Sequence, residues 1–337
     1  MRLPGRPKPQ PRTPSYTPTG LGGWLRKAIG IGLILTAVMM ALSRAPDLPV
    51  DALVGRWAPA PSTFMDIRGQ LVHVRDQGLS GDALPIVLIH GTSASLHTWE
   101  GWVRALKVQR RVITFDLPGF GLTGPFTGEY TPDDYRGDTY ARFVLDLLDA
   151  LQIQRAVLGG NSLGGEVAWR TAVMAPDRVA SLVLVDAVGP AFTPASIPLG
   201  FRIARIPVLN RLSEFALPRS LVAEGVANVY GDPSRIKPEL VDRYYELTLR
   251  DGNRRALVQR IQGIVNGEHA ERITTIRQPT LLIWGSLDRL VPVSVGEEFA
   301  RLIPGSQLVV LDGLGHVPQE EDPLRSVEPV RAFLGLR

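Results

Sequence analysis

The residues best suited to chemistry are a serine set between glycines, in the segment Gly160-Asn161-Ser162-Leu163-Gly164. A short apolar run precedes the segment and apolar residues at helical spacing follow it, so we expect a strand, a tight turn and a helix. Glycine on both sides lets the backbone turn sharply and lifts the serine hydroxyl above the sheet. This placement is typical of a nucleophile that attacks a carbonyl carbon. A glycine-rich structural turn is the alternative.

A serine hydroxyl becomes a good nucleophile only when a base removes its proton and an acid orients that base. Of the five histidines, His316 lies in the glycine-rich residues 313–318, directly after the last expected strand. Asp288 follows the strand before it. The carboxyl ends of parallel strands meet at one edge of a sheet, so Ser162, Asp288 and His316 are expected to converge there. A surface-loop histidine and a turn aspartate paired with Arg289 are the alternatives.

Attack on a carbonyl also needs donors for the oxygen that becomes negative, the oxyanion hole. We expect two backbone N–H groups to supply it, that of Leu163 and that of Thr92. Gly91 permits the turn that carries Thr92 toward the site, and His90 is expected to brace this loop by hydrogen bonding. Losing one such donor costs an enzyme about 3 kcal/mol of transition-state stabilisation.

The elements that must position these residues alternate between short β-branched runs and helical segments, which predicts a mostly parallel sheet covered by helices on both faces. The expected strands are 64–67, 71–75, 85–90, 111–115, 156–160, 180–185, 279–284 and 307–311, the first two forming a hairpin. The expected helices of the sheet layers are 139–151, 162–175, 294–302 and 324–333. A long interruption without strands predicts a helical cap over the site. The body then divides into a first core segment (62–189), a cap (190–272) and a second core segment (273–337).

With these motifs assembled, the sequence resembles the α/β-hydrolase superfamily, and within it the capped esterases, carbon–carbon bond hydrolases and epoxide hydrolases. The matching segments are HGTSASLHTW (90–99), DLPGFGLTG (116–124), GNSLGG (160–165), WGSLDRLVP (284–292) and GHVPQEEDP (315–323). The resemblance implies an α/β-hydrolase fold with a catalytic triad at Ser162, Asp288 and His316, in the chain order that this fold uses. Related epoxide hydrolases and haloalkane dehalogenases carry an aspartate nucleophile. The serine here favours ester or carbon–carbon bond hydrolysis.

The predicted function is therefore cleavage of carboxylic esters through an acyl-enzyme, with a small, lipophilic ester as substrate. The apolar residues of the cap either line an acyl pocket or form the cap's own core. Three alternatives stay open: a carbon–carbon bond hydrolase of the meta-cleavage-product type, a cofactor-free perhydrolase or haloperoxidase-like enzyme, and a non-enzymatic scaffold. No cofactor and no metal are expected, because the chain has no cysteine and no metal-ligand spacing.

The charge of the chain is concentrated at its beginning. The formal net charge is +4, yet residues 1–27 hold six basic residues and no acid, which leaves 31 basic against 33 acidic residues in the rest. A basic tail of this kind does not give the body a nucleic-acid-binding face, and no nucleic acid is expected as a partner.

The N-terminal region predicts a membrane attachment. We expect a disordered basic tail (1–23), a membrane anchor helix (24–44) and a Pro-rich linker (45–61). The uncharged run 28–42 has 15 residues, and a spanning helix needs about 20, so Trp24 and Leu25 would have to contribute at the interface. Basic residues stay cytoplasmic, which places the catalytic body in the periplasm or otherwise outside the cytoplasm. A cleaved signal peptide with a secreted body, and a buried or interfacial helix, are the alternatives.

Overall fold

The computed structural model describes residues 21–130, 134–207, 209–212 and 214–336. The chain divides into two compact units, residues 1–44 and residues 45–337. Most of the predicted disordered tail, residues 1–20, lies outside the described residues, so that prediction stays untested.

The first unit contains a single described helix, α1 (Leu21–Leu42), where the membrane anchor was predicted. None of the helices in the described part of the chain is long and apolar enough to cross a membrane. Arg26 and Lys27 fall inside α1 and leave an uncharged run of 15 residues, 28–42. That run is shorter than the roughly 20 residues of a spanning helix. The predicted single-pass anchor is therefore not supported.

Eight strands of the second unit form one sheet in the order β1-β2-β4-β3-β5-β6-β7-β8. The strands are β1 (Ser62–Ile67), β2 (Gln70–Gly78), β3 (Ile86–Ile89), β4 (Arg111–Phe115), β5 (Ala156–Asn161), β6 (Val179–Val185), β7 (Thr280–Gly285) and β8 (Gln307–Leu311). β2 is antiparallel to both β1 and β4, and all other neighbours are parallel. The predicted hairpin and the mostly parallel sheet are confirmed.

The opening hairpin turns through Arg68 and Gly69, which have φ angles of 52° and 82°. Two positive φ angles in a two-residue loop suit the right-handed twist of the paired strands. In the middle of the sheet, β3, β5 and β7 are buried along their whole length. Strands covered on both faces read as continuous apolar runs, which is the pattern that identified them in the sequence.

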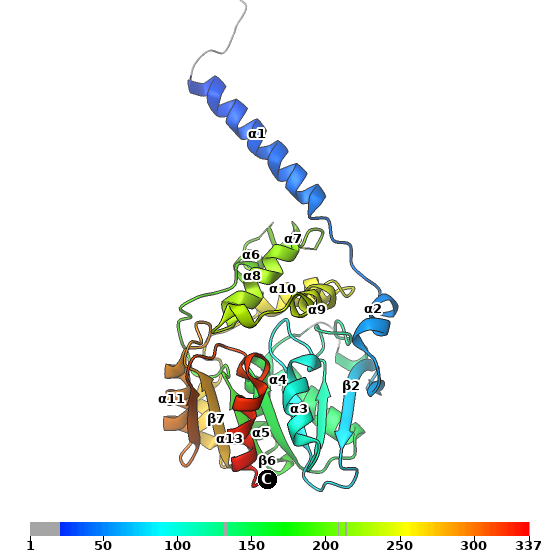
Figure 1. The fold of residues 1–337 in the computed structure, drawn as a ribbon, viewed down its shortest axis with the longest axis vertical. Helices are drawn as coiled ribbons and strands as arrows, with labels where there is room; N and C mark the ends of the chain where they lie inside the picture. Colours follow the sequence, from blue (N-terminus) through cyan, green and yellow to red (C-terminus); the bar gives the residue numbers. More distant parts are fainter. Residues whose placement is uncertain (1–20, 131–133, 208, 213, 337) are drawn as a thin grey trace, which may run out of the picture. The chain divides into compact units, whose positions relative to one another are not determined.

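Helices cover the sheet on both faces (Figure 1). One apolar core joins Ile89 to Phe299 of α11, and the other joins Leu88 to Trp102 of α3 and Val330 of α13. Successive residues of β3 thus point into different cores, as the period of a strand requires. The helices of these layers are α3 (Glu100–Leu106), α4 (Gly137–Ala150), α5 (Leu163–Met174), α11 (Val293–Leu302), α12 (Pro318–Glu321) and α13 (Pro323–Phe333), with 3₁₀ turns η1 (Leu96–Trp99), η2 (Gly128–Tyr130) and η3 (Pro176–Arg178).

Between β6 and β7 the chain leaves the sheet and forms the cap segment, residues 190–272. In Figure 1 its helices gather beyond one end of the strands. They are α6 (Leu199–Ala204), α7 (Leu209–Leu212), α8 (Arg219–Val229), η4 (Pro233–Arg235), α9 (Pro238–Thr248) and α10 (Asn253–Gln262), with η5 (Ala270–Thr275) leading back toward the sheet. The described residues of the cap segment contain no strand, in agreement with the sequence pattern.

The predicted Pro-rich linker (45–61) is not a free tether. It contains helix α2 (Val50–Trp57), and Leu53 of that helix is buried in a small apolar cluster with Leu247. The indole N–H of Trp57 donates to Glu246 of α9 at 2.7 Å. The prolines indicated a stiff chain, but the apolar residues between them follow helical spacing and pack against the cap segment.

Candidate active site

Ser162 lies at the predicted turn between β5 and α5. Its φ is +56° and its ψ is −117°, a conformation that side chains other than glycine rarely adopt. The helix therefore begins at Leu163, one residue later than the sequence predicted. A Cβ atom on Gly160 would overlap the carbonyl oxygen of Gly164, and one on Gly164 would overlap that of Ile89. Only glycine fits at these two positions, which explains the spacing of the motif.

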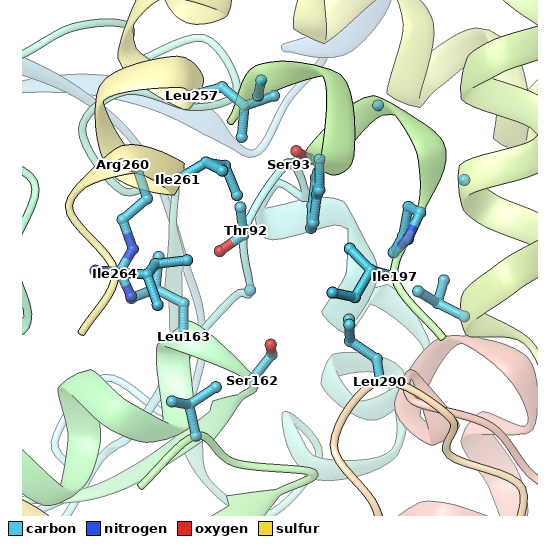
Figure 2. Close-up of a pocket in the computed structure, with 18 of the residues that line it drawn as sticks. Thr92, Ser93, Ser162, Leu163, Ile197, Leu257, Arg260, Ile261, Ile264 and Leu290 are labelled. Carbon is cyan, nitrogen blue, oxygen red and sulfur yellow. The ribbon is translucent and has the colours of Figure 1, made fainter. Parts of the chain in front are cut away.

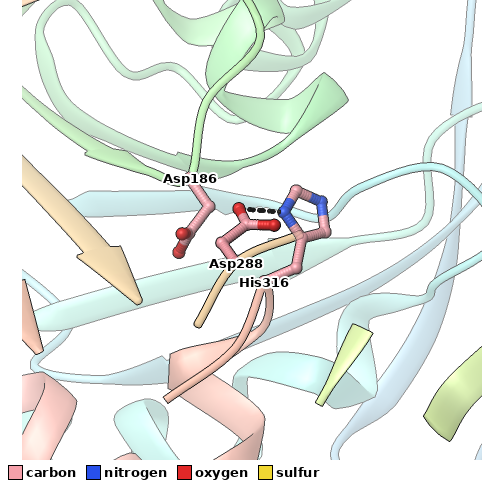
Figure 3. A group of neighbouring side chains, drawn as sticks. All are labelled: Asp186, Asp288 and His316. Atoms are coloured by element: carbon pink, nitrogen blue, oxygen red, sulfur yellow. Dashed lines mark hydrogen bonds and ion pairs between the residues drawn. The ribbon is translucent and has the colours of Figure 1, made fainter. Parts of the chain in front are cut away.

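His316 and Asp288 form a buried hydrogen-bonded pair (Figure 3). The imidazole Nδ1 lies 2.7 Å from Oδ2 of Asp288. The other oxygen of Asp288 accepts from the backbone N–H groups of Leu290 and Val291, at 2.8 and 2.9 Å. Because an ionised carboxylate only accepts, the proton of this bond belongs to Nδ1, which leaves Nε2 able to take a proton. This is the arrangement that a general base requires.

A side-chain bridge joins the nucleophile turn to the histidine loop. The amide of Asn161 donates to the carbonyl oxygen of His316 at 2.9 Å and to that of Val185 at 3.1 Å. Ser162 and His316 both line one cavity. The structure thus brings Ser162, Asp288 and His316 together at the carboxyl edge of the sheet.

The expected oxyanion donors are placed at the same cavity. Thr92 and Leu163 both line it, and Figure 2 shows Thr92 across the cavity from Ser162. Leu163 is the first residue of α5, so the helix itself offers no acceptor for its N–H. A Cβ on Gly91 would lie 3.1 Å from Cβ of Ser162, which shows how closely this loop passes the nucleophile.

His90 is fixed behind that loop. Its Nδ1 donates to the carbonyl oxygen of Gly91 at 2.7 Å, and its Nε2 accepts from the N–H of Leu117 at 2.9 Å. Burial lowers the pKa of His90, so the ring is neutral and both nitrogens are committed to the backbone. The ring has no nitrogen left for chemistry.

The cavity above Ser162 has a volume of about 360 Å³ and a largely apolar wall. Figure 2 shows the serine hydroxyl pointing into a space framed by Ile197, Leu257 and Ile261 of the cap segment and by Leu290. Of the apolar cap residues considered from sequence, Phe192, Ile197, Phe201 and Ile203 line the cavity. Leu199, Ile206, Leu209 and Phe215 are exposed instead. The cap therefore contributes both a pocket wall and an outer apolar surface.

The charged groups of the cavity wall were not anticipated. Arg260 of α10 bonds Oε2 of Glu166 at 2.8 Å, and Oε1 of Glu166 lies 3.0 Å from Arg170. Arg254 pairs with Asp47 at 2.5 Å. The partners lie 94 and 207 residues apart along the chain, and no local pattern predicts such pairing. Both guanidinium groups face a carboxylate, so neither adds an uncompensated positive charge to the cavity.

Two further acids near the site were also missed. Glu321 of α12 accepts from the backbone N–H of Gly315, beside the histidine, and from that of Gly231 in the cap segment. Asp186, directly after β6, accepts from the N–H of Gly285 at 2.9 Å.

A second Ser–His–Asp arrangement is formed by residues of β1, of β2 and of the loop after β4, at the other end of the strand order. His73 Nε2 lies 2.8 Å from the hydroxyl of Ser62, and its Nδ1 lies 2.8 Å from Asp116. However, the Ser62 hydroxyl also accepts from Arg75, and Asp116 accepts from the N–H groups of Leu96 and Leu122. Neither Ser62 nor His73 lines the cavity. This chain of bonds joins the edge strands and the loops to one another.

Comparison with known proteins places this geometry in a known family. A family model described as the alpha/beta hydrolase fold matches residues 85–323. The chain is 29% identical to the dihydrolipoyllysine-residue acetyltransferase component of the acetoin cleaving system of Pseudomonas putida, over 91% of this chain and 81% of that protein. It is 30% identical to 2-hydroxymuconate semialdehyde hydrolase of Pseudomonas sp. (strain CF600), over 76% of this chain and 88% of that protein. Its structure is similar to the crystal structure of a membrane phospholipase A, a bacterial virulence factor, with a TM-score of 0.67 and a sequence identity of 25%. The match covers 94% of this chain and 97% of that protein.

Proposed function

This chain belongs to the α/β-hydrolase fold family, and on that premise we propose that it is a serine hydrolase that cleaves carboxylic esters with a lipophilic acyl chain. The observation that carries the proposal is the cavity above Ser162, with its apolar wall and with Arg254 and Arg260 each paired with a carboxylate. A cavity of about 360 Å³ falls at the lower end of the range for small-molecule sites. An uncharged hydrocarbon chain is the ligand that such a wall favours.

The proposed reaction has two steps. His316 Nε2 takes the proton of the Ser162 hydroxyl as the oxygen attacks the ester carbonyl, and Asp288 stabilises the imidazolium that forms. The N–H groups of Thr92 and Leu163 hold the oxyanion. The intermediate collapses to the acyl-enzyme, and the departing alkoxide takes the proton from His316. Water then loses a proton to His316 and attacks the acyl carbonyl. The serine oxygen takes that proton back from His316 as the acid is released, which restores the free enzyme.

Carbon–carbon bond hydrolysis is the second candidate, because one relative carries the name 2-hydroxymuconate semialdehyde hydrolase. The substrate in that name bears a carboxylate, which needs an available positive charge near the nucleophile. Here Arg260 is already paired with Glu166 and Arg254 with Asp47, while Arg205, the third arginine of the wall, is exposed to solvent. The ester proposal agrees better with this wall, and the name of the phospholipase relative also points to a lipophilic acyl group.

The test is a substrate series on the purified full chain in detergent. We expect the specificity constant for p-nitrophenyl esters to rise from the butyrate to the octanoate or longer, and we expect micellar substrate to be hydrolysed. A vinylogous 1,5-diketone acid should be turned over at least a hundredfold more slowly than the best ester. Preference for the diketone acid would favour carbon–carbon bond hydrolysis. The Ser162→Ala variant, folded by circular dichroism, should hydrolyse none of these substrates.

Attachment to a membrane through residues 24–44, with the body outside the cytoplasm, stays a prediction of the sequence. Its support is the exposure of large apolar side chains on α1, among them Trp24, Ile31 and Leu33. Washing membranes with carbonate tests it. An anchored protein stays in the pellet until detergent is added, and a soluble one leaves with the wash.

A further inference from the structure

A second carboxyl group lies directly behind the acid of the proposed triad. Asp186 is fully buried, and it shares with Asp288 and His316 a cluster in which one polar atom of each lies within 4.8 Å of the others. Figure 3 shows Asp288 between Asp186 and His316. Asp186 Oδ1 accepts from Gly285, whereas its Oδ2 is buried without a hydrogen-bond partner. A buried polar atom without a partner is rare enough to need an explanation.

The groups around Asp186 explain why its Oδ2 has no hydrogen-bond partner. The titratable groups that face it are Asp288 after β7, His316 after β8 and Glu321 of α12. Burial, and next the negative charge of Asp288, raise the pKa of Asp186 well above its ordinary value. This carboxyl therefore holds a proton more tightly than an ordinary aspartate does, and Oδ2 is the oxygen left to carry it. Two acids this close hold one negative charge between them.

We propose that Asp186 is a positioning residue of the active site, which holds a proton beside Asp288 and supplies the negative charge behind His316 when Asp288 cannot. The inference rests on the proposed function, since it concerns the same triad. In the resting protein, the O–H of Asp186 faces Asp288 and keeps that carboxylate directed at Nδ1 of His316. Without the charge of Asp288, Asp186 releases its proton to solvent, and its carboxylate then stabilises the imidazolium.

The backbone at Asp186 makes asparagine the right substitution. Its φ of +45° lies in the left-handed region, where asparagine and aspartate are the most readily accepted side chains after glycine. Asparagine still offers an oxygen to the N–H of Gly285 and an N–H to Asp288. It differs from aspartic acid chiefly in being unable to ionise. Alanine would add backbone strain and remove the bond to Gly285, so its effect would not isolate the charge.

The experiment compares the full chain with Asp186→Asn, Asp288→Asn and the double variant. Two rates are followed from pH 6 to pH 9, ester hydrolysis and labelling of Ser162 by a fluorophosphonate. Both rates of the Asp288→Asn variant should rise at least tenfold from pH 6 to pH 9, because Asp186 must lose a proton to act. The double variant should lack this rise, and its fold-loss of rate should exceed the product of the fold-losses in the two single variants. Asp312→Asn is the matched control, since Asp312 lies outside the cluster and bonds Ser286.

Two results would overturn the inference. One is an Asp288→Asn rate that follows the same pH dependence as that of the double variant, and the other is losses that simply multiply. Infrared difference spectra of the protein minus Asp186→Asn give a readout that is independent of activity. They should show the carbonyl band of an un-ionised carboxyl at pH 8, and its absence would also overturn the inference. If the unaltered protein neither labels nor hydrolyses esters, the proposed function fails instead.

Discussion

The backbone N–H of His316 donates a 2.8 Å hydrogen bond to the carbonyl oxygen of Val229, the last residue of α8 in the cap segment. The loop that carries the imidazole is therefore bonded directly to the cap. Glu321 reinforces the attachment, because one of its oxygens accepts from both Gly315 and Gly231. A displacement of α8 would move the base as well as the pocket wall, so the position of the cap and the geometry of the triad depend on each other.

This attachment makes Glu321→Gln a test of the coupling. One carboxylate oxygen becomes an NH₂ group that faces N–H donors, so at least one of the bonds to the two loops is lost. We expect kcat to fall about tenfold, the effect of ~1.4 kcal/mol in the activation barrier. Glu320→Gln is the control, because Glu320 bonds Arg243 at 2.7 Å but not the histidine loop. It should lower the melting temperature with little effect on kcat, and equal losses of kcat in both variants would refute the coupling.

The tight turn at Ser162 predicts that one methyl group added at Gly164 strongly lowers the stability of the fold. Gly164→Ala would place Cβ against the carbonyl oxygen of Ile89, which belongs to a central strand and cannot move aside. We expect the free energy of unfolding to fall by about 2 kcal/mol or more, within the range of strained or overpacked sites. Gly55→Ala in α2 is the comparison, since no atom lies within 4 Å of the added Cβ. It should be neutral or stabilising by up to about 1 kcal/mol. Denaturant unfolding measures both.

The ion pair between Glu166 and Arg260 predicts how the charge of the cavity wall affects substrate preference. In Glu166→Gln only one oxygen remains to accept from Arg260 or Arg170, and the guanidinium of Arg260 loses its opposite charge. The cavity wall becomes more positive, and substrates that end in a carboxylate should gain. We expect the ratio of kcat/KM for a hemiglutarate ester over a pentanoate ester to rise about tenfold, as one charge interaction of ~1.4 kcal/mol would produce. An unchanged ratio in a folded variant would mean that Arg260 does not reach the acyl chain.

Asp186 gives stability a predictable dependence on pH. Its pKa in the folded state is raised by burial and by Asp288, whereas in the unfolded chain an aspartate titrates near 3.9. Above that unfolded pKa the unfolded chain loses a proton that the folded protein keeps, so this group's contribution to stability falls as the pH rises through the window. Asp186→Asn lacks this effect. Its stability relative to the unaltered protein should therefore rise from pH 5 to pH 8 in urea unfolding, and a constant difference would contradict the assignment.

The sequence predicted what local patterns encode. Buried strands read as apolar runs, so the sheet could be predicted from the sequence. Ser162 and His316 lie in short motifs that directly follow strands, so their meeting at one cavity could be predicted as well. Interactions between distant residues left no such signal. The pairing of Glu166 with Arg260 and the approach of Asp186 to the triad depend on how the chain folds back on itself. Residues 45–61 were misread for a related reason, because prolines there flank a helix whose apolar partners, among them Leu122 and Leu247, lie far away in the sequence.

The most direct measurement of the central claim is covalent labelling of the folded full chain with a fluorophosphonate, followed by peptide mass analysis. A serine reacts only when a base and an oxyanion hole activate it. We predict a single adduct on the peptide that contains Ser162, and no adduct in the Ser162→Ala variant. A folded protein that takes no label, or one labelled at another serine such as Ser62 beside His73, would contradict the proposed triad.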